Sequence, residues 1–387
     1  MDHTKRRSIP WIWPLTLGIG IAIGAVVFGE RRLEQPGAVA IATAPVPASA
    51  PTQAPAATVA PTAAPTSTPV DVTRMRPYSE TSVWNTPIGP NPVYDRHSDA
   101  MVATIGLKAQ GRITADASEY SYTVYFVDSS TPRWDVPCTR YKCTIVTPEE
   151  TRKTEVLPDV PIPPEARPSS GTDGQMIVID TSTYTEYNLW GVERTPTGWT
   201  ARNGSIYNIL WDAMPTRYGS RGAGLPYYAG LVRPWEILQG QIDHAIAFAY
   251  PYPAEGRCVF PASKTDGNSS LPYAIPEGAR LQLDPTLTEA DFDRMGLSRT
   301  GKIIAQALQQ YGMILINYAG RPKINVENLE DNPFATVKWS DPELNLPTDV
   351  IANIPYTSFR VLALPEAYWT QASDSPMHGQ CYAYPGR

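Results

Sequence analysis

Short runs of apolar residues, rich in β-branched and aromatic side chains, recur along the chain after residue 112. Turn-forming triplets such as Thr-Asp-Gly, Pro-Thr-Gly and Pro-Glu-Gly precede several of these runs, and this combination predicts β-strands. The predicted strands cover residues 123–127, 175–180, 185–193, 198–203, 242–250, 279–284, 313–318 and 359–364.

One segment instead has the periodicity of a helix. Ser298 or Thr300 can cap its start, and Gly312 ends it. Its apolar stripe consists of Ile303, Ile304, Ala307, Leu308 and Tyr311. Two shorter helices are predicted at residues 98–107 and 234–238. Because many strands follow one another with few helices between them, we predict a mainly β fold: an antiparallel β-sandwich or jelly roll with one clear helix and a few short peripheral helices.

An uncharged apolar segment at residues 9–29 follows basic residues at positions 5–7 and has about the length of a membrane-spanning helix. We predict a transmembrane signal anchor that leaves residues 1–8 in the cytoplasm and places the rest of the chain outside. Small residues at 38–42 leave open a late signal-peptide cleavage, which would release a secreted protein.

Residues 30–71 are dominated by Ala, Pro, Thr and Val and have no hydrophobic period. Such a composition buries too little apolar surface to fold, so it predicts a disordered, extended stalk. The remaining residues, 72–387, contain no second break of this kind and no repeat of fixed period. We therefore predict a single extracytoplasmic domain, which we expect to be monomeric.

The formal net charge is −6, and no run of Lys or Arg interrupts the part predicted to be exported. Nucleic acid is therefore not expected as a partner, because binding it usually leaves a basic footprint. The sequence also lacks the G-x-S-x-G, H-E-x-x-H, phosphate-loop and dinucleotide-binding motifs, which excludes the commonest serine hydrolases, zinc proteases and nucleotide enzymes. A neutral polymer, such as a polysaccharide or another glycan, or a small ligand fits better.

Four cysteines lie in the exported part, where an oxidising compartment favours disulfides. Cys138 and Cys143 are close enough in sequence to close a tight loop, which leaves Cys258 to pair with Cys381. Zinc binding is the rival interpretation, but no histidine has ligand spacing from a cysteine pair. We predict no metal and no cofactor, although the Asp-Gly-Asn sequence at 266–268 leaves calcium open through its oxygen ligands.

Side-chain alternation in the strand at 185–193 places Glu186, Asn188 and Trp190 on one face. A carboxylate, an amide and an indole in a row suit a sugar, whose ring can stack on the indole while its hydroxyls bond to the other two groups. The alternative is a solvent-exposed polar face with one stray aromatic residue. We predict Glu186 as a catalytic residue and Asn188 and Trp190 as substrate-binding residues.

Three further residues are catalytic candidates. His244 lies among apolar residues on one face of the strand at 242–250, which favours a core histidine satisfied by a hydrogen bond. At the cleft end of that strand, with Asp243 beside it, it would instead be a general acid or base. Asp180 ends a strand before a Thr-Ser-Thr turn, so it either forms the turn or supplies a second carboxylate.

A glycine-rich aromatic loop at residues 218–230 suits the rim of a cleft better than a core. It provides Tyr218, Tyr227 and Tyr228 as predicted substrate-binding residues. Arg202 is another, because a basic residue can neutralise the charge of an acidic sugar.

Five sequence blocks follow one another in a fairly specific order. They are SVWNTPI at 82–88, DGQMIVID with TEYNLW, AGLVRPWEILQGQIDHAIAF at 229–248, LPYAIPEGARLQLDP at 271–285 and IIAQALQQYGMILIN at 303–317. In this order they resemble a broad group of secreted bacterial proteins over most of residues 78–365. The resemblance implies a β-sandwich or jelly roll of the sort used by polysaccharide-degrading enzymes and lectins, and it carries no catalytic residue to transfer.

Two functions are expected from these observations. The first is a membrane-anchored, extracytoplasmic carbohydrate-active enzyme. As a glycoside hydrolase it needs two carboxylates, with Glu186 and either Asp243 or Asp180 as the best pair. As a polysaccharide lyase it needs a base such as His244 or a tyrosine, and a basic residue such as Arg233 to neutralise an acidic sugar. The second function is a non-catalytic surface module that binds a glycan or a partner protein.

Overall fold

The computed structural model describes residues 71–147, 150–212, 219–370 and 381–382. The predicted anchor, nearly all of the predicted stalk and Tyr218 lie outside these residues. Within the described ranges, no helix is long and apolar enough to cross a membrane.

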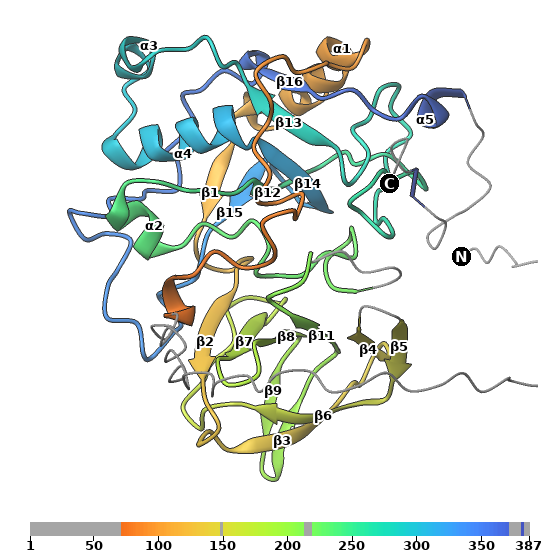
Figure 1. Ribbon diagram of the computed structural model, residues 1–387, viewed down its shortest axis with the longest axis vertical. Coiled ribbons are helices and arrows are strands. Elements are labelled where there is room, and N and C mark those ends of the chain that lie inside the picture. The colour runs from red at the N-terminus through yellow and green to blue at the C-terminus, as the bar shows by residue number, and fades with distance from the viewer. Residues whose placement is uncertain (1–70, 148–149, 213–218, 371–380, 383–387) are drawn as a thin grey trace, which may run out of the picture. The chain divides into compact units, whose positions relative to one another are not determined.

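The described chain is mainly β, as predicted, and most of its strands belong to two six-stranded sheets. The first sheet, in the upper half of Figure 1, has the order β1 (Thr114–Asp116), β15 (Lys323–Asn325), β12 (Ile246–Tyr250), β14 (Met313–Tyr318), β13 (Arg280–Leu283) and β16 (Phe359–Val361). The second sheet, in the lower half, has the order β2 (Thr123–Val127), β7 (Met176–Asp180), β8 (Thr185–Trp190), β11 (Asn203–Asn208), β4 (Cys143–Val146) and β5 (Thr151–Thr154). Two smaller pairs are β3 (Arg133–Pro137) with β6 (Val156–Pro161), and β9 (Glu193–Thr195) with β10 (Gly198–Thr200).

Both large sheets mix parallel and antiparallel neighbours. The parallel neighbours are β1 with β15, β12 with β14, β2 with β7, and β4 with β11. Parallel neighbours need a long crossover connection, and between β12 and β14 this connection contains α3 (Glu289–Arg294) and α4 (Arg299–Gln310). The alternation of apolar and polar residues along one strand does not show whether the neighbouring strand runs parallel or antiparallel to it. The antiparallel pairing expected from the sequence therefore describes only part of each sheet.

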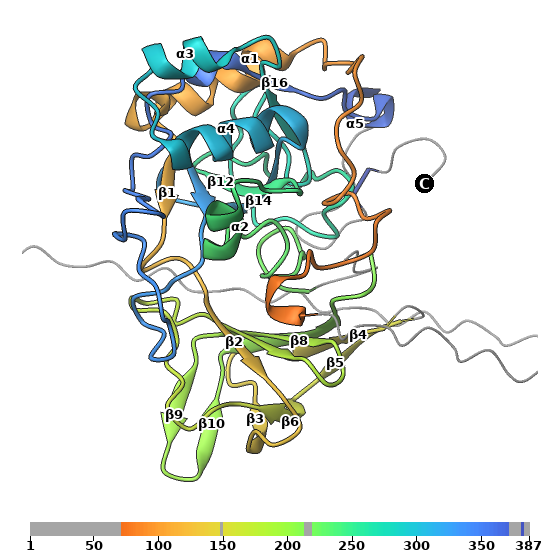
Figure 2. The same ribbon diagram turned by 60° about the vertical axis from the view of Figure 1, so that its left-hand side comes forward.

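The helix α4 is the one that the sequence predicts most clearly. Ser298 caps it, since its hydroxyl accepts a hydrogen bond from the backbone N–H of Gly301 at 3.2 Å. Its apolar stripe packs against the first sheet (Figure 2), and the chain leaves the helix at Gly312, whose φ of 71° favours glycine. The shorter helices are α1 (Ser98–Ala103), α2 (Pro234–Gln239) and α5 (Glu366–Thr370), and the 3₁₀ turns are η1 (Val72–Arg74), η2 (Ile105–Leu107), η3 (Ala109–Gly111) and η4 (Tyr356–Ser358).

The strand boundaries agree with the sequence where apolar periodicity is strong. Strands β2 and β14 have the predicted bounds, whereas the predicted strand at 185–193 divides into β8 and β9 at Gly191, where φ is 60°. The strands that periodicity missed include β11 and β15, in which asparagine, glycine or lysine interrupts the apolar pattern. Short polar strands of this kind depend on their neighbours for pairing.

Successive residues of the central strands face different layers. In β12, Phe248 packs toward α4, whereas Ala247 and Ala249 face the second sheet. In β7, Ile177 and Ile179 face the first sheet. The inner faces of the two sheets therefore belong to one hydrophobic core, and α4 covers the outer face of the first sheet.

The segment at residues 220–232 fills the space between the two sheets. Leu225 and Leu231 in this segment are fully buried in the same core as the inner faces of the sheets. Gly230 allows the closest approach, because a Cβ atom there would lie 2.6 Å from the backbone nitrogen of Ala247. The small alanines of β12 thus leave room for a layer of irregular backbone.

Two disulfides confirm the predicted pairing of the cysteines. Cys138 bonds to Cys143, five residues away, and Cys258 bonds to Cys381, 123 residues away. Next to the second disulfide, the backbone nitrogen of Tyr382 donates a hydrogen bond to the Cys258 carbonyl at 2.9 Å. The described end of the chain is thereby held against the body of the domain.

Candidate functional site

Glu186 and Asn188 share a face of β8, as predicted, but both faces of this strand are buried, and this one lies against the 220–232 segment. The Glu186 carboxylate accepts hydrogen bonds from the Tyr78 hydroxyl at 2.7 Å, the Asn188 amide at 2.5 Å and the Tyr228 backbone N–H at 3.0 Å. The side-chain oxygen of Asn188 accepts a hydrogen bond from the Tyr227 backbone N–H at 2.8 Å. Burial raises the pKa of Glu186. The two side chains therefore hold the 220–232 segment against the second sheet.

Trp190, the third residue of this predicted row, is half-buried. Its ring is stacked on Tyr141 with 6.3 Å between centroids, and the guanidinium groups of Arg140 and Arg202 lie 5.7 and 5.6 Å from the ring centroid. Its Nε1 atom donates a hydrogen bond to Asp173 at 3.3 Å. Side chains of the protein thus pack against the indole ring of Trp190, and its Nε1–H orients the Asp173 carboxylate.

The aromatic segment predicted for a cleft rim lies in the interior, and this expectation was wrong for the residues described. Tyr227 and Tyr228 are 5% and 1% exposed, between the two sheets. Arg221 binds their backbone, because its guanidinium donates to the carbonyl oxygens of Tyr227 at 2.6 Å and Ala229 at 2.8 Å. Satisfying carbonyl groups in this way lets irregular backbone be buried.

His244 belongs to a buried cluster that also contains Arg233 and Glu236. Its Nε2 atom lies 2.9 Å from Glu236 Oε1, and Arg233 forms an ion pair with the same oxygen. Arg233 also donates to the Tyr228 hydroxyl at 2.8 Å. Burial opposes ionisation of Glu236, but Arg233 and His244 outweigh it and lower the pKa of Glu236 to about 2. His244 is 3% exposed, so it is a core histidine whose ring is hydrogen-bonded.

The other predicted carboxylates do not join Glu186 at one place. Asp180 lies on the opposite face of β7 from Ile179, the partner of Glu186, and forms an ion pair with Arg133 at 2.5 Å. Asp243 is half-buried before β12, where it accepts a hydrogen bond from Gln241. Within the described residues, Glu186 therefore shares no hydrogen-bond partner with Asp180 or Asp243.

A polar cavity of about 750 Å³ brings together a different set of groups. Its lining includes the carboxylates Asp116, Asp173 and Asp266 and the ammonium group of Lys323. We call this space the polar cavity. Asp173 belongs to the Thr-Asp-Gly turn triplet before residue 175, and Asp266 begins the Asp-Gly-Asn sequence that left calcium open; both line the same cavity.

Strands β1 and β15 build one wall of the polar cavity. Their parallel register pairs Asp116 with Asn325, and Lys323 Nζ lies 3.0 Å from Asp116 Oδ2 and 2.9 Å from the Tyr120 carbonyl oxygen. Asn325 is 2% exposed, and its side-chain oxygen has no hydrogen-bond partner among the described residues. An unpaired buried acceptor is costly, so a donor from a ligand would stabilise this wall.

Asp266 also lines the polar cavity and is fixed from several sides. Its Oδ1 atom accepts a hydrogen bond from the Tyr318 backbone N–H at 3.0 Å, and its own N–H donates to Glu277 at 3.1 Å. Gly222 packs against the carboxylate so closely that a Cβ atom there would lie 2.3 Å from Oδ1. Burial and the Asp266 charge raise the pKa of Glu277 well above its usual value, and the Glu277 carboxyl group holds the backbone of Asp266 in place through this hydrogen bond.

Two tyrosines offer aromatic surface where the polar cavity meets solvent. Tyr120 is 43% exposed and Tyr318 is 44% exposed, and both line the cavity. Lys323 Nζ lies 5.3 Å from the Tyr120 ring centroid. The cavity therefore combines exposed aromatic rings with buried polar groups that are aimed inward, which is the usual composition of a site for a small ligand.

Sequence reasoning missed Asp116, Lys323 and Asn325. A signal was present in the Lys-Ile-Asn sequence at 323–325, where two polar residues alternate with an apolar one in a short buried strand. In the part of the chain that the structure describes, no group of three or more His, Cys, Asp or Glu side chains is arranged to hold a metal ion.

Comparison with known proteins gives no further guide to function: no family model matches the chain, and no match was found among curated proteins or solved structures.

Proposed function

We propose that this chain is an extracytoplasmic carbohydrate-active protein that binds a saccharide in the polar cavity. One observation carries the proposal: Asp116, Asp173, Asp266 and the unpaired Asn325 oxygen converge on a single cavity flanked by exposed tyrosine rings. Sugar rings stack on aromatic side chains, and sugar hydroxyl groups can donate to the unpaired Asn325 oxygen and to the carboxylate oxygens that line the cavity.

The charges around the polar cavity favour a neutral ligand. Three acidic side chains line it together with three basic ones, Lys108, Arg321 and Lys323, so the lining has no formal net charge. A strongly charged ligand would leave part of this set uncompensated. A neutral saccharide with many hydroxyl groups would bind to both kinds of group.

Hydrolysis of a glycosidic bond is the reaction that this set of carboxylates supports. Asp116 forms an ion pair with Lys323. Asp173 and Asp266 each accept a hydrogen bond at Oδ1. One of these two would protonate the leaving oxygen, and the other would activate water or attack the sugar carbon. Glu277, whose pKa is raised by burial, is not among the residues that line the polar cavity, and this favours binding without turnover as the second candidate function.

We place this activity outside the cytoplasm, on a protein anchored by its N-terminal apolar segment or released from it. The two disulfides support this location, because such bonds persist in oxidising compartments. In the part of the sequence predicted to be exported there is no run of Lys or Arg, which is also consistent with a glycan partner.

The test uses the full chain with its disulfides intact, on a glycan array and in a reducing-sugar assay. Asp173→Asn and Asp266→Asn should each weaken binding or abolish turnover. Asp349→Asn is the matched control, since Asp349 is exposed and does not line the polar cavity. Folded wild-type protein that neither binds nor cleaves any glycan would overturn the proposal. Binding that survives without turnover would support the non-catalytic function.

A further inference from the structure

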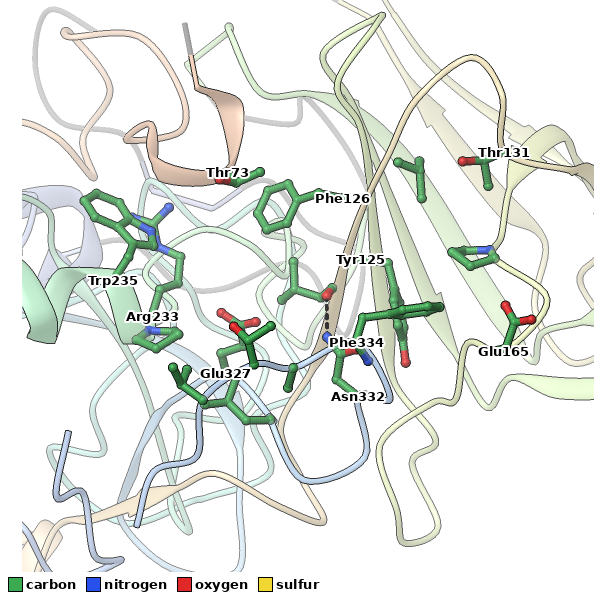
Figure 3. Close-up of a pocket in the computed structure, with 18 of the residues that line it drawn as sticks. Thr73, Tyr125, Phe126, Thr131, Glu165, Arg233, Trp235, Glu327, Asn332 and Phe334 are labelled. Carbon is green, nitrogen blue, oxygen red and sulfur yellow. Dashed lines mark hydrogen bonds between the residues drawn. The ribbon is translucent and has the colours of Figure 1, made fainter. Parts of the chain in front are cut away.

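A second cavity, which we call the apolar cavity, has a volume of about 650 Å³. Figure 3 shows Arg233 and Trp235 together at one end of it, Thr131 and Glu165 at the other, and Tyr125 and Phe334 between them. The walls come from β2, from the start of α2 and from the chain after β15. Neither the predicted sugar-binding face nor the polar cavity includes it.

Two residues that line the apolar cavity each have a buried N–H group without an acceptor among the described residues. Arg233 is 1% exposed, and its Nη atoms are bound to the carbonyl of Met75, the hydroxyl of Tyr228 and the carboxylate of Glu236. Its Nε atom has no partner among the described residues, and the same is true of Trp235 Nε1. Leaving a charged donor unpaired is costly, so both atoms indicate an acceptor that a ligand supplies.

Glu327 adds a third polar group at the same end of the apolar cavity. No hydrogen bond to its carboxyl group is present within the described residues, and the side chain is 8% exposed. Burial raises the pKa of Glu327 to about 8, with Arg233 acting to lower it and Glu236 to raise it. Tyr228 is the other titratable group whose electrostatics are coupled to Glu327. At neutral pH the Glu327 carboxyl therefore carries its proton and acts as a hydrogen-bond donor.

Most of the remaining lining is apolar, and the other acidic side chain in it, Glu165, lies at the end away from Arg233 (Figure 3). The apolar side chains around the cavity include Val124, Phe126, Leu329, Phe334 and Val337. Apolar walls with a few convergent polar groups are typical of sites for small ligands of this size. The ligand should therefore have an apolar body and one group that accepts hydrogen bonds.

We propose that the apolar cavity binds a small carboxylic acid with an apolar body. Its carboxylate would accept hydrogen bonds from Arg233 Nε, Trp235 Nε1 and the Glu327 carboxyl. An anion is favoured over a neutral acceptor because charge-assisted bonds to a guanidinium are stronger. This site is independent of the proposed saccharide site, so either can fail without the other.

Titration calorimetry on the full chain can test the proposal, with dodecanoate as the probe below its aggregation concentration. Dodecyltrimethylammonium, which has the same chain and the opposite charge, is the control ligand. Dodecanoate should bind and the cation should not. Binding of both ligands alike, or of neither, would overturn the proposal.

The pH dependence identifies the role of Glu327. The protonated fraction of a group with a pKa of about 8 falls from about nine-tenths at pH 7 to about one-tenth at pH 9, so dodecanoate affinity should fall about tenfold. The probe is ionised at both values. Glu327→Gln keeps a donor without a titration, so it should bind with no such fall. A fall that persists in this variant would contradict the assignment.

Two further variants separate the sites. Ala335→Trp should block the apolar cavity and abolish dodecanoate binding, with the melting temperature used to confirm folding. Asp173→Asn, in the polar cavity, should leave dodecanoate affinity unchanged. If the second variant abolished dodecanoate binding, the ligand would have to lie in the polar cavity.

Discussion

Trp190 Nε1 donates a hydrogen bond to Asp173 Oδ1 over 3.3 Å. This contact connects the last residue of β8 with the turn before β7. It therefore links the strand face that the sequence predicted to bind sugar with the polar cavity, where we propose that the sugar binds. The indole thus orients a carboxylate from outside the cavity, whereas the sequence predicted that it would stack on the ligand.

Trp190→Phe should weaken saccharide binding roughly two- to tenfold. The substitution keeps an aromatic ring against Arg202 and removes only the N–H that orients Asp173, and one hydrogen bond contributes about 0.5–1.5 kcal/mol. Calorimetry with a glycan identified on the array measures the change. Trp134→Phe is the control, because its Nε1 atom donates to the Ile162 carbonyl at 3.3 Å, away from the cavity. Equal losses in both variants would contradict the role given to Trp190.

Gly222→Ala should reduce saccharide binding and turnover by roughly tenfold to a hundredfold. The added methyl group would lie 2.3 Å from Asp266 Oδ1, so the carboxylate must move, and a shift of about 1 Å in a reacting group can cost about a hundredfold in rate. Gly89→Ala is the matched control, since a Cβ atom there meets nothing within 4 Å. Normal activity in a folded Gly222→Ala protein would remove Asp266 from the site.

Glu327→Gln should change the pH dependence of stability. The folded protein holds the Glu327 proton up to a pKa of about 8, whereas the ordinary value is 4.5. The stability contributed by Glu327 is therefore complete below pH 4.5 and is lost as the pH rises to 8. Relative to the wild type, the variant should gain on the order of a few kcal/mol in free energy of unfolding over this interval.

Urea unfolding at pH 4.5, 6 and 8 measures that gain. Glu330→Gln is a suitable comparison, because Glu330 is exposed and its substitution should give no trend with pH. If the free energies of unfolding of the Glu327→Gln variant and the wild type ran parallel across this interval, Glu327 would not be protonated in the folded state.

The two disulfides should differ in their contribution to stability. Opening Cys258–Cys381 with a double serine substitution should lower the free energy of unfolding by about 5 kcal/mol, and opening Cys138–Cys143 by about 2 kcal/mol, because the loss grows with the length of the closed loop. Thermal unfolding of both double variants under the same conditions tests the order. A larger loss from the short loop would show that local packing dominates.

Much of the local structure follows from residues close together in the sequence. Ser298 caps α4 and Gly312 ends it, because these residue types suit those backbone positions. Alternation correctly placed Glu186 and Asn188 on one face of β8, since successive side chains of any strand point to opposite sides. The even number of cysteines and the short spacing of Cys138 and Cys143 were sufficient for the disulfide pairing.

What covers each face was decided only by the tertiary structure. Alternation cannot tell that the 220–232 segment lies on the face bearing Glu186, because that segment is far away in the sequence and is held there by backbone hydrogen bonds. Asp116, Asp173 and Asp266 likewise come from three separate parts of the chain, and each alone is an ordinary polar residue near a strand or turn. They become one site only when the parallel pairing of β1 with β15 and the packing of Gly222 bring them around the same cavity. Which strands pair depends on the free energy of the whole fold. It leaves no periodic pattern in the sequence of any single strand.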